Sequence, residues 1–384
     1  MRTPYFGSVR NFVGWLAFGL STNTFKEIGM EVGVLGSFLV PLSSMLAAFG
    51  FLPLAHRTGF VDHPNGRKQH AAPVPLTGGV VVFVGLMAAG LATGLWDGEG
   101  WGWFLAAAVI LTTVGTLDDI YDLSARWRFL IQGVTVTLAC AVSGVYINSL
   151  GLLMGDSVLL LGGLFGLVFT LVCALACINA YNMIDGIDGQ AGCVTLITLA
   201  GVAVLSTVSG HHNTGLFAGL SCLALLVYLM FNLEVPWLRG RKMFLGDGGS
   251  NLLGFLVLWL VVLGSQRDGS FPPIVAVWLV GVPILDMLAV FMRRTLSGRS
   301  PFSADRTHIH HLLLDHGFNA RQALIMVAAM HMAMVGFGVL GTLAGWSEFT
   351  LTVGTFVAGG AYFSLSFLLG TGRLTALVAS RTDR

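Results

Sequence analysis

The chain has 384 residues, of which 55% are hydrophobic and 10% are charged, whereas about 25% are charged in a typical soluble domain. This composition excludes an ordinary water-soluble globular enzyme, and a net charge of +1 gives no reason to expect a nucleic-acid partner. Continuous apolar runs of ~20 residues instead predict transmembrane helices, and their lack of alternation excludes a β-barrel.

The apolar runs predict an all-α, polytopic integral membrane protein with about eleven transmembrane helices. We expect these spans at residues 32–55, 78–95, 101–117, 129–147, 158–180, 191–209, 214–233, 249–265, 273–293, 322–345 and 349–370. Residues 1–30 form an N-terminal extension to which the sequence assigns no role. Residues 31–384 form a single polytopic membrane domain.

The basic residues are distributed unevenly between the two sets of loops. Of the 20 Lys and Arg residues, 16 fall in alternate loops and in the C-terminal tail, and the opposite loops hold only Arg267. Lys and Arg accumulate on the cytoplasmic side of membrane proteins. We therefore expect the basic loops and the C-terminus to face the cytoplasm.

The first basic loop, VDHPNGRKQHAAPVPLTGG at 61–79, contains Lys68 and His70 before a Pro-rich entry to the next span. Its charges are those of an ordinary positive-inside loop. Taken alone, it does not indicate a function.

Two adjacent carboxylates, Asp118 and Asp119, stand at the end of the span at 101–117. Negative charge at a helix C-terminus opposes the helix dipole, so a cation is needed to compensate it. In one interpretation the cation is Arg126 or Arg128. In the other it is Mg²⁺, which binds one or two carboxylates together with substrate phosphates.

Four polar residues follow one another at every third position where the span at 158–180 ends: Asn179, Asn182, Asp185 and Asp188. On a helix the first three share one face, and Gly186 and Gly189 can break the helix and bring the fourth round. The Asp-Gly pairs are also typical of a turn. A turn does not explain two asparagines that continue an apolar span, so the pattern favours a polar cavity.

A further carboxylate, Asp247, lies among glycines in FLGDGGS at the start of the span at 249–265. One interpretation is a helix N-cap, for which aspartate is a preferred residue. The other is a site where glycines let a phosphate or a metal approach the backbone, with Phe244 near enough in sequence to stack on a flat ring. The residues alone leave both open.

Histidines gather in the stretch RSPFSADRTHIHHLLLDHGF at 299–318. His308, His310 and His311 lack the i,i+4 pair that one helical face offers a metal, and no cysteine is near, so we do not expect zinc. Arg306 beside these imidazoles suits an anion such as a diphosphate. The plainer interpretation is a solvated amphipathic helix with incidental histidines.

Asp286 lies about seven residues inside the span at 273–293, or ~10 Å from its end. An intramembrane carboxylate marks a functional site or pairs with a structural cation. In the second case the expected partner is Arg293 or Arg294.

Together these loops resemble those of the polyprenyl-phosphate N-acetylhexosamine-1-phosphate transferases. The matching blocks are DHPNGRKQHAAPVPLTGG, the LDD at 117–119, NAYNMIDGIDG, FLGDGGS and RSPFSADRTHIHHL, in family order between residues 57 and 318. The last block is similar to that of the bacterial undecaprenyl-phosphate N-acetylglucosamine-1-phosphate transferases, which start O-antigen and related glycans. The resemblance implies the bacterial inner membrane and an active site on cytoplasmic loops.

The resemblance also implies a role for each matching residue. Mg²⁺, or Mn²⁺ in its place, is expected on Asp118, Asp119 and Asp247. These aspartates and His308 are the expected catalytic residues. The expected substrate contacts are Lys68, His70, Asn179, Asn182, Asp185, Asp188, Asn232, Phe244, Arg306, His310 and His311. Within this set Phe244 is expected to stack on uracil, and Arg306 and the histidines to hold the diphosphate and the sugar.

The implied reaction transfers an N-acetylhexosamine 1-phosphate, first of all that of N-acetylglucosamine, from its UDP-sugar to undecaprenyl phosphate and releases UMP. The expected partners are the UDP-N-acetylhexosamine, undecaprenyl phosphate and membrane lipids, with a homodimer left open. Another UDP-N-acetylhexosamine or UDP-MurNAc-pentapeptide remains an alternative donor. A transporter is disfavoured, because its polar residues should lie at mid-membrane and not at one face.

Overall fold

The structure is a computed structural model that describes residues 23–63, 72–153, 157–301 and 306–371. The helices are α2 (Asn23–Thr58), α3 (Gly78–Thr93), α4 (Trp101–Tyr121), α5 (Ala125–Ser143), α6 (Gly163–Ile184), α7 (Gln190–Val208), α8 (His212–Asn232), α9 (Gly246–Val262), α10 (Pro273–Leu279), α11 (Gly281–Leu296), α12 (Ile309–Asp315), α13 (Ala320–Leu343) and α14 (Glu348–Gly370). Short helical turns are η1 (Leu95–Asp97), η2 (Pro236–Leu238) and η3 (Leu263–Arg267). The strands β1 (Val61–Asp62) and β2 (Val74–Pro75) pair antiparallel.

The predicted all-α, polytopic architecture is confirmed. Every expected span coincides with a helix, and the span at 273–293 coincides with the pair α10 and α11. Within the described residues, 8 helices are long and apolar enough to cross a membrane, or 9 if the bent α10–α11 pair counts as one span. α3 is a shorter apolar helix and α5 is not among the eight, so the predicted number of eleven stays a prediction. The proposed extension at 1–30 also stays a prediction, because residues 1–22 lie outside the described residues.

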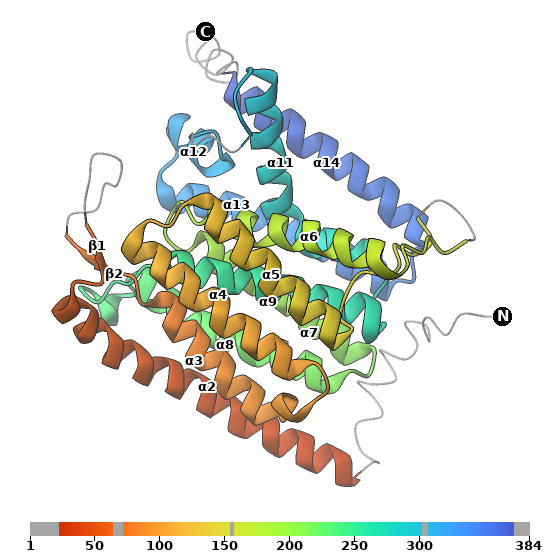
Figure 1. Cartoon of the computed structure of the whole chain (residues 1–384), viewed down its shortest axis with the longest axis horizontal. Helices are drawn as coiled ribbons and strands as arrows, with labels where there is room; N and C mark the ends of the chain where they lie inside the picture. The colour runs from red at the N-terminus through yellow and green to blue at the C-terminus, as the bar shows by residue number, and fades with distance from the viewer. Residues whose placement is uncertain (1–22, 64–71, 154–156, 302–305, 372–384) are drawn as a thin grey trace.

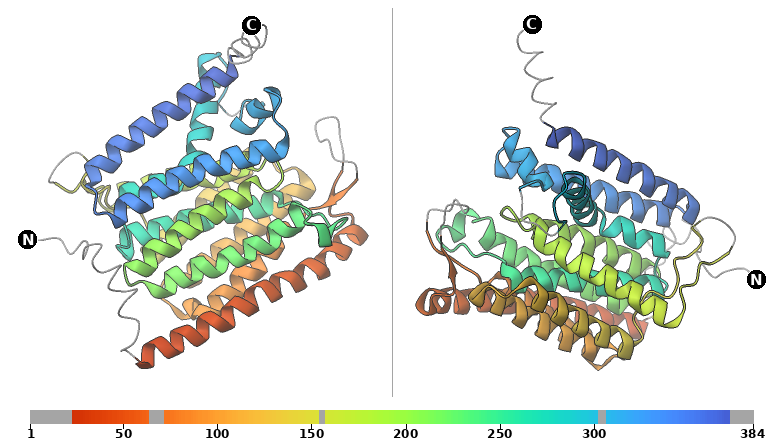
Figure 2. Two further views of the ribbon diagram at one scale, coloured as in Figure 1. Left: turned by 180° about the vertical axis from the view of Figure 1, so that it is seen from behind. Right: turned by 45° about the horizontal axis from the view of Figure 1, so that its top comes forward.

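α9 is the central helix of the bundle and is buried from Gly248 to Val262. Its packing against α3 and α4 depends on glycines. A Cβ on Gly79 would lie 2.5 Å from the Gly249 nitrogen, and one on Gly115 would lie 2.5 Å from the Asp247 carbonyl. A side chain at either position would push the start of α9 away. α2 and α14 lie at opposite edges of the bundle (Figure 1, Figure 2).

α10 and α11 meet at a bend of 76°. The helical partner of the Leu279 carbonyl would be the N–H of residue 283, but Pro283 has none. Thr198 Oγ1 donates to that carbonyl instead, at 2.7 Å. Backbone groups inside a membrane must be satisfied within the protein. Thr198 therefore stabilises the bend, after which α11 runs at a steep angle to the neighbouring helices (Figure 1).

One end of the bundle, which we call the polar end, carries the end of α4, the α6–α7 turn, the segment before α9, and α12 (left in Figure 1). β2 is attached here, because the Phe244 N–H donates to the Pro75 carbonyl at 2.8 Å and the Phe244 carbonyl accepts from the Gly78 N–H at 2.9 Å. Lys68 and His70 lie in the range 64–71, outside the described residues, so their expected contacts stay predictions.

Candidate active site

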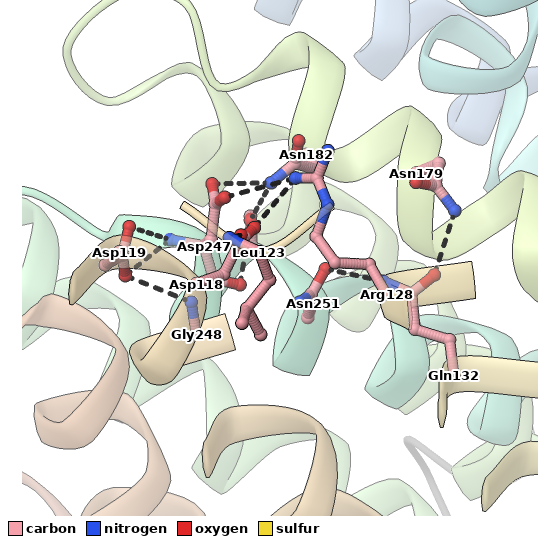
Figure 3. A network of polar contacts seen from close by, with 11 residues as sticks. Asp118, Asp119, Leu123, Arg128, Gln132, Asn179, Asn182, Asp247, Gly248 and Asn251 are labelled. Carbon is pink, nitrogen blue, oxygen red and sulfur yellow. Dashed lines mark hydrogen bonds and ion pairs between the residues drawn. The ribbon is translucent and has the colours of Figure 1, made fainter. Parts of the chain in front are cut away.

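Asp118 and Asp119 occupy the last turn of α4 and make different contacts (Figure 3). Asp118 is buried; its Oδ1 accepts from the Leu123 N–H at 2.8 Å, and its Oδ2 accepts from Arg128 Nη1 at 2.7 Å. Asp119 accepts from the Asp247 N–H through both carboxylate oxygens, at 3.0 Å each. Of the cations that the sequence offered for this pair, Arg128 compensates Asp118 in the structure.

Asp119 caps the start of α9 from a neighbouring helix. The first backbone N–H groups of a helix have no partner within the helix and carry partial positive charge, which a carboxylate satisfies. The N-cap residue of α9 is Leu245, whose side chain accepts no capping hydrogen bond. The interpretation of Asp247 as an N-cap is therefore wrong. Because Asp119 supplies the cap, the Asp247 carboxylate is available for other contacts.

The Asp247 carboxylate lies between α6 and Arg128 (Figure 3). Its Oδ1 accepts from Asn182 Nδ2 at 2.8 Å, and its Oδ2 lies 3.6 Å from Arg128 Nη1. Asn182 also donates to Ser250 Oγ at 2.9 Å. Arg128 thus stands between Asp118 and Asp247, which come from α4 and α9. Its contact with Asp247 is too long for a hydrogen bond, so Asp247 keeps acceptor capacity for another cation or donor.

Asn179 lies one turn away from this cluster and belongs to a different network (Figure 3). Its Nδ2 donates to Gln132 Oε1 at 3.1 Å, and Gln132 Nε2 donates to Asn251 Oδ1 at 3.3 Å. These bonds join α5, α6 and α9 inside the bundle without involving an aspartate of the site. The structure therefore gives Asn179 a packing contact, and its expected contact with substrate stays a prediction.

The α6–α7 turn exposes Asp188 beside the segment before α9. Gly189 has a φ of +78°, a conformation that suits glycine, and the expected break in the helix at this turn is confirmed. Asp188 pairs with Lys242 at 2.6 Å, and Lys242 Nζ lies 5.3 Å from the centre of the Phe244 ring. Lys242 thus connects the acidic α6–α7 turn with Phe244, the aromatic ring that we expect to stack on uracil.

Asp185, at the end of α6, is partly buried and faces other carboxylates. Its burial, followed by the charges of Asp247, Asp188 and Asp119, raises its pKa to about 7. A group of carboxylates that disfavour one another's ionisation is stabilised by a proton or by a bound cation. A cation bound beside Asp185 would therefore be stabilised by these carboxylates.

Asn232, the last residue of α8, is buried and connects two loops. Its Oδ1 accepts from the Gly189 N–H at 2.5 Å, and its Nδ2 donates to the Met243 carbonyl at 2.9 Å. These bonds hold the α6–α7 turn beside the segment before α9. The nucleotide contact that the sequence expects of Asn232 stays a prediction.

The histidine loop packs on the α6–α7 turn. His310 is 1% exposed, and its imidazole Nε2 occupies the space that a Cβ on Gly186 would need. Burial and then the neighbouring His311 lower the pKa of His310 to about 3, which keeps the ring neutral. The interpretation of this stretch as a solvated helix with incidental histidines is wrong, because α12 is packed into the bundle.

The other members of the loop differ in exposure. His308 is buried at the N-cap position of α12, whereas His311 is half-buried and Arg306 is exposed. Burial and then the charge of Arg306 lower the pKa of His311. The structure therefore brings Arg306 and three imidazoles to the polar end, and their expected contacts with the diphosphate and the sugar stay predictions.

Asp286, inside α11, takes its partners from the histidine loop. Its Oδ2 lies 2.7 Å from His308 Nδ1. The expected pairing with Arg293 or Arg294 is wrong. Arg293 extends instead to α14, where its Nη1 donates to the Ser366 carbonyl at 2.8 Å.

Two comparisons with known proteins match this chain. The model of glycosyl transferase family 4 matches residues 101–265. Undecaprenyl-phosphate alpha-N-acetylglucosaminyl 1-phosphate transferase of Yersinia pestis is 38% identical over 298 residues, which cover 77% of this chain and 81% of that protein. The chain belongs to the family of these undecaprenyl-phosphate alpha-N-acetylglucosaminyl 1-phosphate transferases. The transferases of the same name from Escherichia coli and Haemophilus influenzae are each 35% identical, with 78% and 84% of this chain and 81% and 91% of their own lengths covered.

Membership of this family makes the chain a phosphoglycosyltransferase, and its helices make it a multi-pass membrane protein. The matched range 101–265 contains α4 to α9, and so holds the aspartate cluster. The histidine loop lies outside that range.

The acidic cluster of this transferase fits Mg²⁺ in the type of its donors. Asp247 and Asp185 both offer carboxylate oxygens, and Mg²⁺ needs only one or two carboxylates when substrate phosphates complete its shell. Among the residues that the structure describes, no three His, Cys, Asp or Glu side chains are arranged to hold one metal ion. Asp119 is engaged by the α9 backbone and Asp118 by Arg128. Joint ligation by Asp118, Asp119 and Asp247 therefore stays a prediction.

The sequence did not single out several residues that support this transferase site. Lys242 pairs with Asp188, and Gln132 carries the network that holds Asn179. Tyr362 donates to Asp286 Oδ1 at 3.0 Å from a position 76 residues later in the chain. Gln132 gave a signal, because it is a polar residue within an expected span. Tyr362 gave none, since a tyrosine is unremarkable in an apolar helix.

Proposed function

We propose that the chain transfers N-acetylglucosamine 1-phosphate from UDP-N-acetylglucosamine to undecaprenyl phosphate, releases UMP, and so begins a cell-envelope glycan. The observation that carries this proposal is the identity of 35–38% over at least 77% of the chain to transferases named for this activity. The site supports it, because carboxylates, an arginine and imidazoles gather at one end of a membrane bundle. A lipid phosphate and a water-soluble UDP-sugar can meet there.

We place the protein in the bacterial inner membrane, with the polar end facing the cytoplasm. The gathering of 16 of the 20 basic residues in one set of loops and in the C-terminal tail supports this orientation. The related transferases come from bacteria, which supports a location in the bacterial inner membrane. The homodimer stays a prediction.

In the proposed reaction an oxygen of the lipid phosphate bonds to the β-phosphorus of the UDP-sugar. The bond from that phosphorus to the bridging oxygen breaks, and UMP leaves with this oxygen. Such a transfer needs positioning and charge neutralisation more than covalent help from the protein. Arg128 is placed for this work, because its Nη1 is 2.7 Å from Asp118 Oδ2 and 3.6 Å from Asp247 Oδ2, and a guanidinium has further N–H groups that can donate to phosphate oxygens.

Mg²⁺ is the proposed cofactor, with Mn²⁺ able to replace it, and would neutralise charge on the substrate phosphates. Asp247 and Asp185 are the side chains best placed to hold it. The long contact with Arg128 leaves Asp247 acceptor capacity, and burial followed by the charges of neighbouring carboxylates raises the pKa of Asp185 to about 7, so a cation bound here would be stabilised. In the structure Asp118 orients Arg128 and Asp119 fixes the start of α9, and their expected share in Mg²⁺ binding with Asp247 stays a prediction.

We place the uracil on Phe244, between the segment before α9 and the α6–α7 turn. Lys242, 5.3 Å from the centre of that ring and paired with Asp188, supplies a positive charge at the edge of the proposed nucleotide site. Asn232 keeps the two loops side by side through its bonds to Gly189 and Met243. The nucleotide thus meets backbone and side chains whose positions the protein fixes in advance.

The decisive experiment uses purified protein with undecaprenyl phosphate, Mg²⁺ and a panel of UDP-sugars, and follows UMP release. We expect UDP-N-acetylglucosamine to be the best donor and UMP release to require the lipid phosphate. Faster release from another UDP-N-acetylhexosamine or from UDP-MurNAc-pentapeptide would overturn the choice of sugar. UMP release that is absent with every donor, together with uptake of a UDP-sugar into vesicles, would overturn the transferase and favour a transporter.

A further inference from the structure

Asp286 is buried within α11 with all of its hydrogen bonds directed at two other elements. It is 1% exposed. Its Oδ2 lies 2.7 Å from His308 Nδ1, and its Oδ1 accepts from the Ile309 N–H at 2.8 Å and from the Tyr362 hydroxyl at 3.0 Å. A single carboxylate thus joins α11 to the start of α12 and to α14.

These contacts determine which nitrogen of His308 carries the proton. A carboxylate accepts hydrogen bonds, so His308 Nδ1 must be the donor to Asp286. In the neutral ring Nε2 is then the unprotonated nitrogen. Within the described residues, His308 Nε2 has no hydrogen-bond partner. Asp286 therefore leaves Nε2 as the atom of this imidazole that can meet a substrate.

The His308 ring, which carries the unprotonated Nε2, lies close to the α6–α7 turn of the candidate site. Its ring lies parallel to the His310 ring, with a centroid separation of 5.8 Å and an interplanar angle of 8°. His310 in turn lies against Gly186, beside Asp185 in the α6–α7 turn. His308 is therefore separated from the α6–α7 turn and its carboxylates by one imidazole ring.

Retention of a carboxylate in a membrane bundle also requires an explanation. Removing its charge from water is unfavourable, so an intramembrane Asp is expected to have a functional use or a structural cation. Within the part of the chain that the structure describes, Asp286 has no hydrogen bond to an arginine or lysine and is satisfied by an imidazole, a backbone N–H and a hydroxyl. This is the arrangement of a group that orients a histidine.

We propose that Asp286, held by Tyr362, is a positioning residue that fixes the ring and the tautomer of His308 so that Nε2 meets the UDP-sugar. The inference rests on the proposed transferase function, because His308 is the group through which Asp286 acts on the reaction. It adds α11 and α14 to the site, although neither contributes a residue to the aspartate cluster.

A double-mutant cycle on UMP release tests this inference. Asp286→Asn keeps the size of the side chain but offers an amide N–H to His308 Nδ1, which favours the opposite tautomer. We expect kcat/KM to fall by on the order of 10–100-fold, the loss seen when an orienting partner of a functional histidine is removed. In a His308→Ala background the same substitution should cost less than about threefold, because groups that act as a unit are not additive. Equal losses in both backgrounds would overturn the proposal.

Two further variants separate positioning from general damage. Tyr362→Phe removes one hydroxyl from Asp286 Oδ1 and should lower kcat/KM by only about threefold to fivefold, the effect of one modest hydrogen bond. Asp268→Asn is the matched control: Asp268 lies 3.9 Å from His211 Nδ1, in a histidine–aspartate pair outside the site. It should leave turnover unchanged. A loss in Asp268→Asn as large as that in Asp286→Asn would overturn a specific role for Asp286.

A spectroscopic readout tests the inference without any substrate. In protein labelled with ¹⁵N-histidine, the His308 resonances, assigned by their loss in His308→Ala, should show a protonated Nδ1 in the wild type. In Asp286→Asn the proton should move to Nε2. An unchanged tautomer would overturn the inference even if activity falls. If the wild type releases no UMP from any donor, the proposed function fails, while this readout still decides whether Asp286 sets the tautomer.

Discussion

Asp286 and Asp247 are both carboxylates on helices of one bundle, yet their surroundings differ. Asp286 has three donors at 2.7–3.0 Å and is 1% exposed. Asp247 has one amide donor at 2.8 Å and an arginine nitrogen only at 3.6 Å. A carboxylate whose acceptor sites are filled can orient a neighbour, whereas one with free acceptor capacity can bind a cation or a substrate. The donors around an acidic residue therefore distinguish its role better than its charge does.

The largest effect should come from a substitution of Asp247, the carboxylate with free acceptor capacity. Asp247→Asn should lower kcat by on the order of 100- to 1,000-fold, the loss typical of one preorganised electrostatic contact, and weaken the dependence on Mg²⁺. UMP release measured across a Mg²⁺ titration checks this, with Mn²⁺ binding followed by electron paramagnetic resonance as a second readout. Asp97→Asn, in η1 outside the site, is a control that should behave as wild type. Normal activity with an unaltered titration would remove Asp247 from the metal site.

The histidine loop should show the next largest effects if it binds the diphosphate. His308→Ala should lower kcat by tens to hundreds of fold, as for loss of one preorganised group. Arg306→Lys should fail to restore wild-type turnover although it keeps the charge, because a forked donor is replaced by a point charge. UMP release measures both, and elemental analysis of chelator-treated protein restored with Mg²⁺ is the control. Stoichiometric zinc that follows activity would contradict an anion site.

A smaller effect is expected at the nucleotide. Phe244→Ala should raise the KM for the UDP-sugar by about fivefold, which corresponds to roughly 1 kcal/mol of base stacking, with less effect on the KM for lipid phosphate. Trp237→Ala, an aromatic residue that is 72% exposed in η2 nearby in sequence, is the matched control and should change neither value. An equal loss for both substrates would argue against stacking on Phe244.

The last effect concerns stability and not turnover, at the buried His310. The pKa of His310 is about 3 in the folded protein and 6.5 in an ordinary histidine. Between these two pH values the unfolded chain therefore binds a proton at this residue, whereas the folded chain does not. Folding should therefore lose up to about 1.4 kcal/mol per pH unit between pH 6.5 and pH 3. Between pH 7 and pH 5 the melting temperature should decline less in His310→Gln than in the wild type, because glutamine does not titrate. Identical slopes in the two proteins would contradict a neutral, buried His310.

The sequence by itself determined the helices and their order. The bilayer thickness sets the length of an apolar run that can span it, and such a run can be recognised in a short stretch of sequence. It also located the polar clusters, since charged residues are rare enough in this chain to be conspicuous. The helix break at Gly189 followed from local backbone preferences as well.

Only the tertiary structure decided the partners of these residues. Nothing in the sequence near Asp247 indicates that α9 is capped by Asp119, a residue 128 positions earlier. The partners of Asp286 were likewise mistaken, because Arg293 and Arg294 are near in sequence whereas His308 and Tyr362 are near in space. The physical reason is that hydrogen bonds depend on distances of about 3 Å between side chains. Those distances are set by the close packing of α9 against α3 and α4 and by the bend between α10 and α11, where Pro283 removes a helical hydrogen bond and the distant Thr198 replaces it.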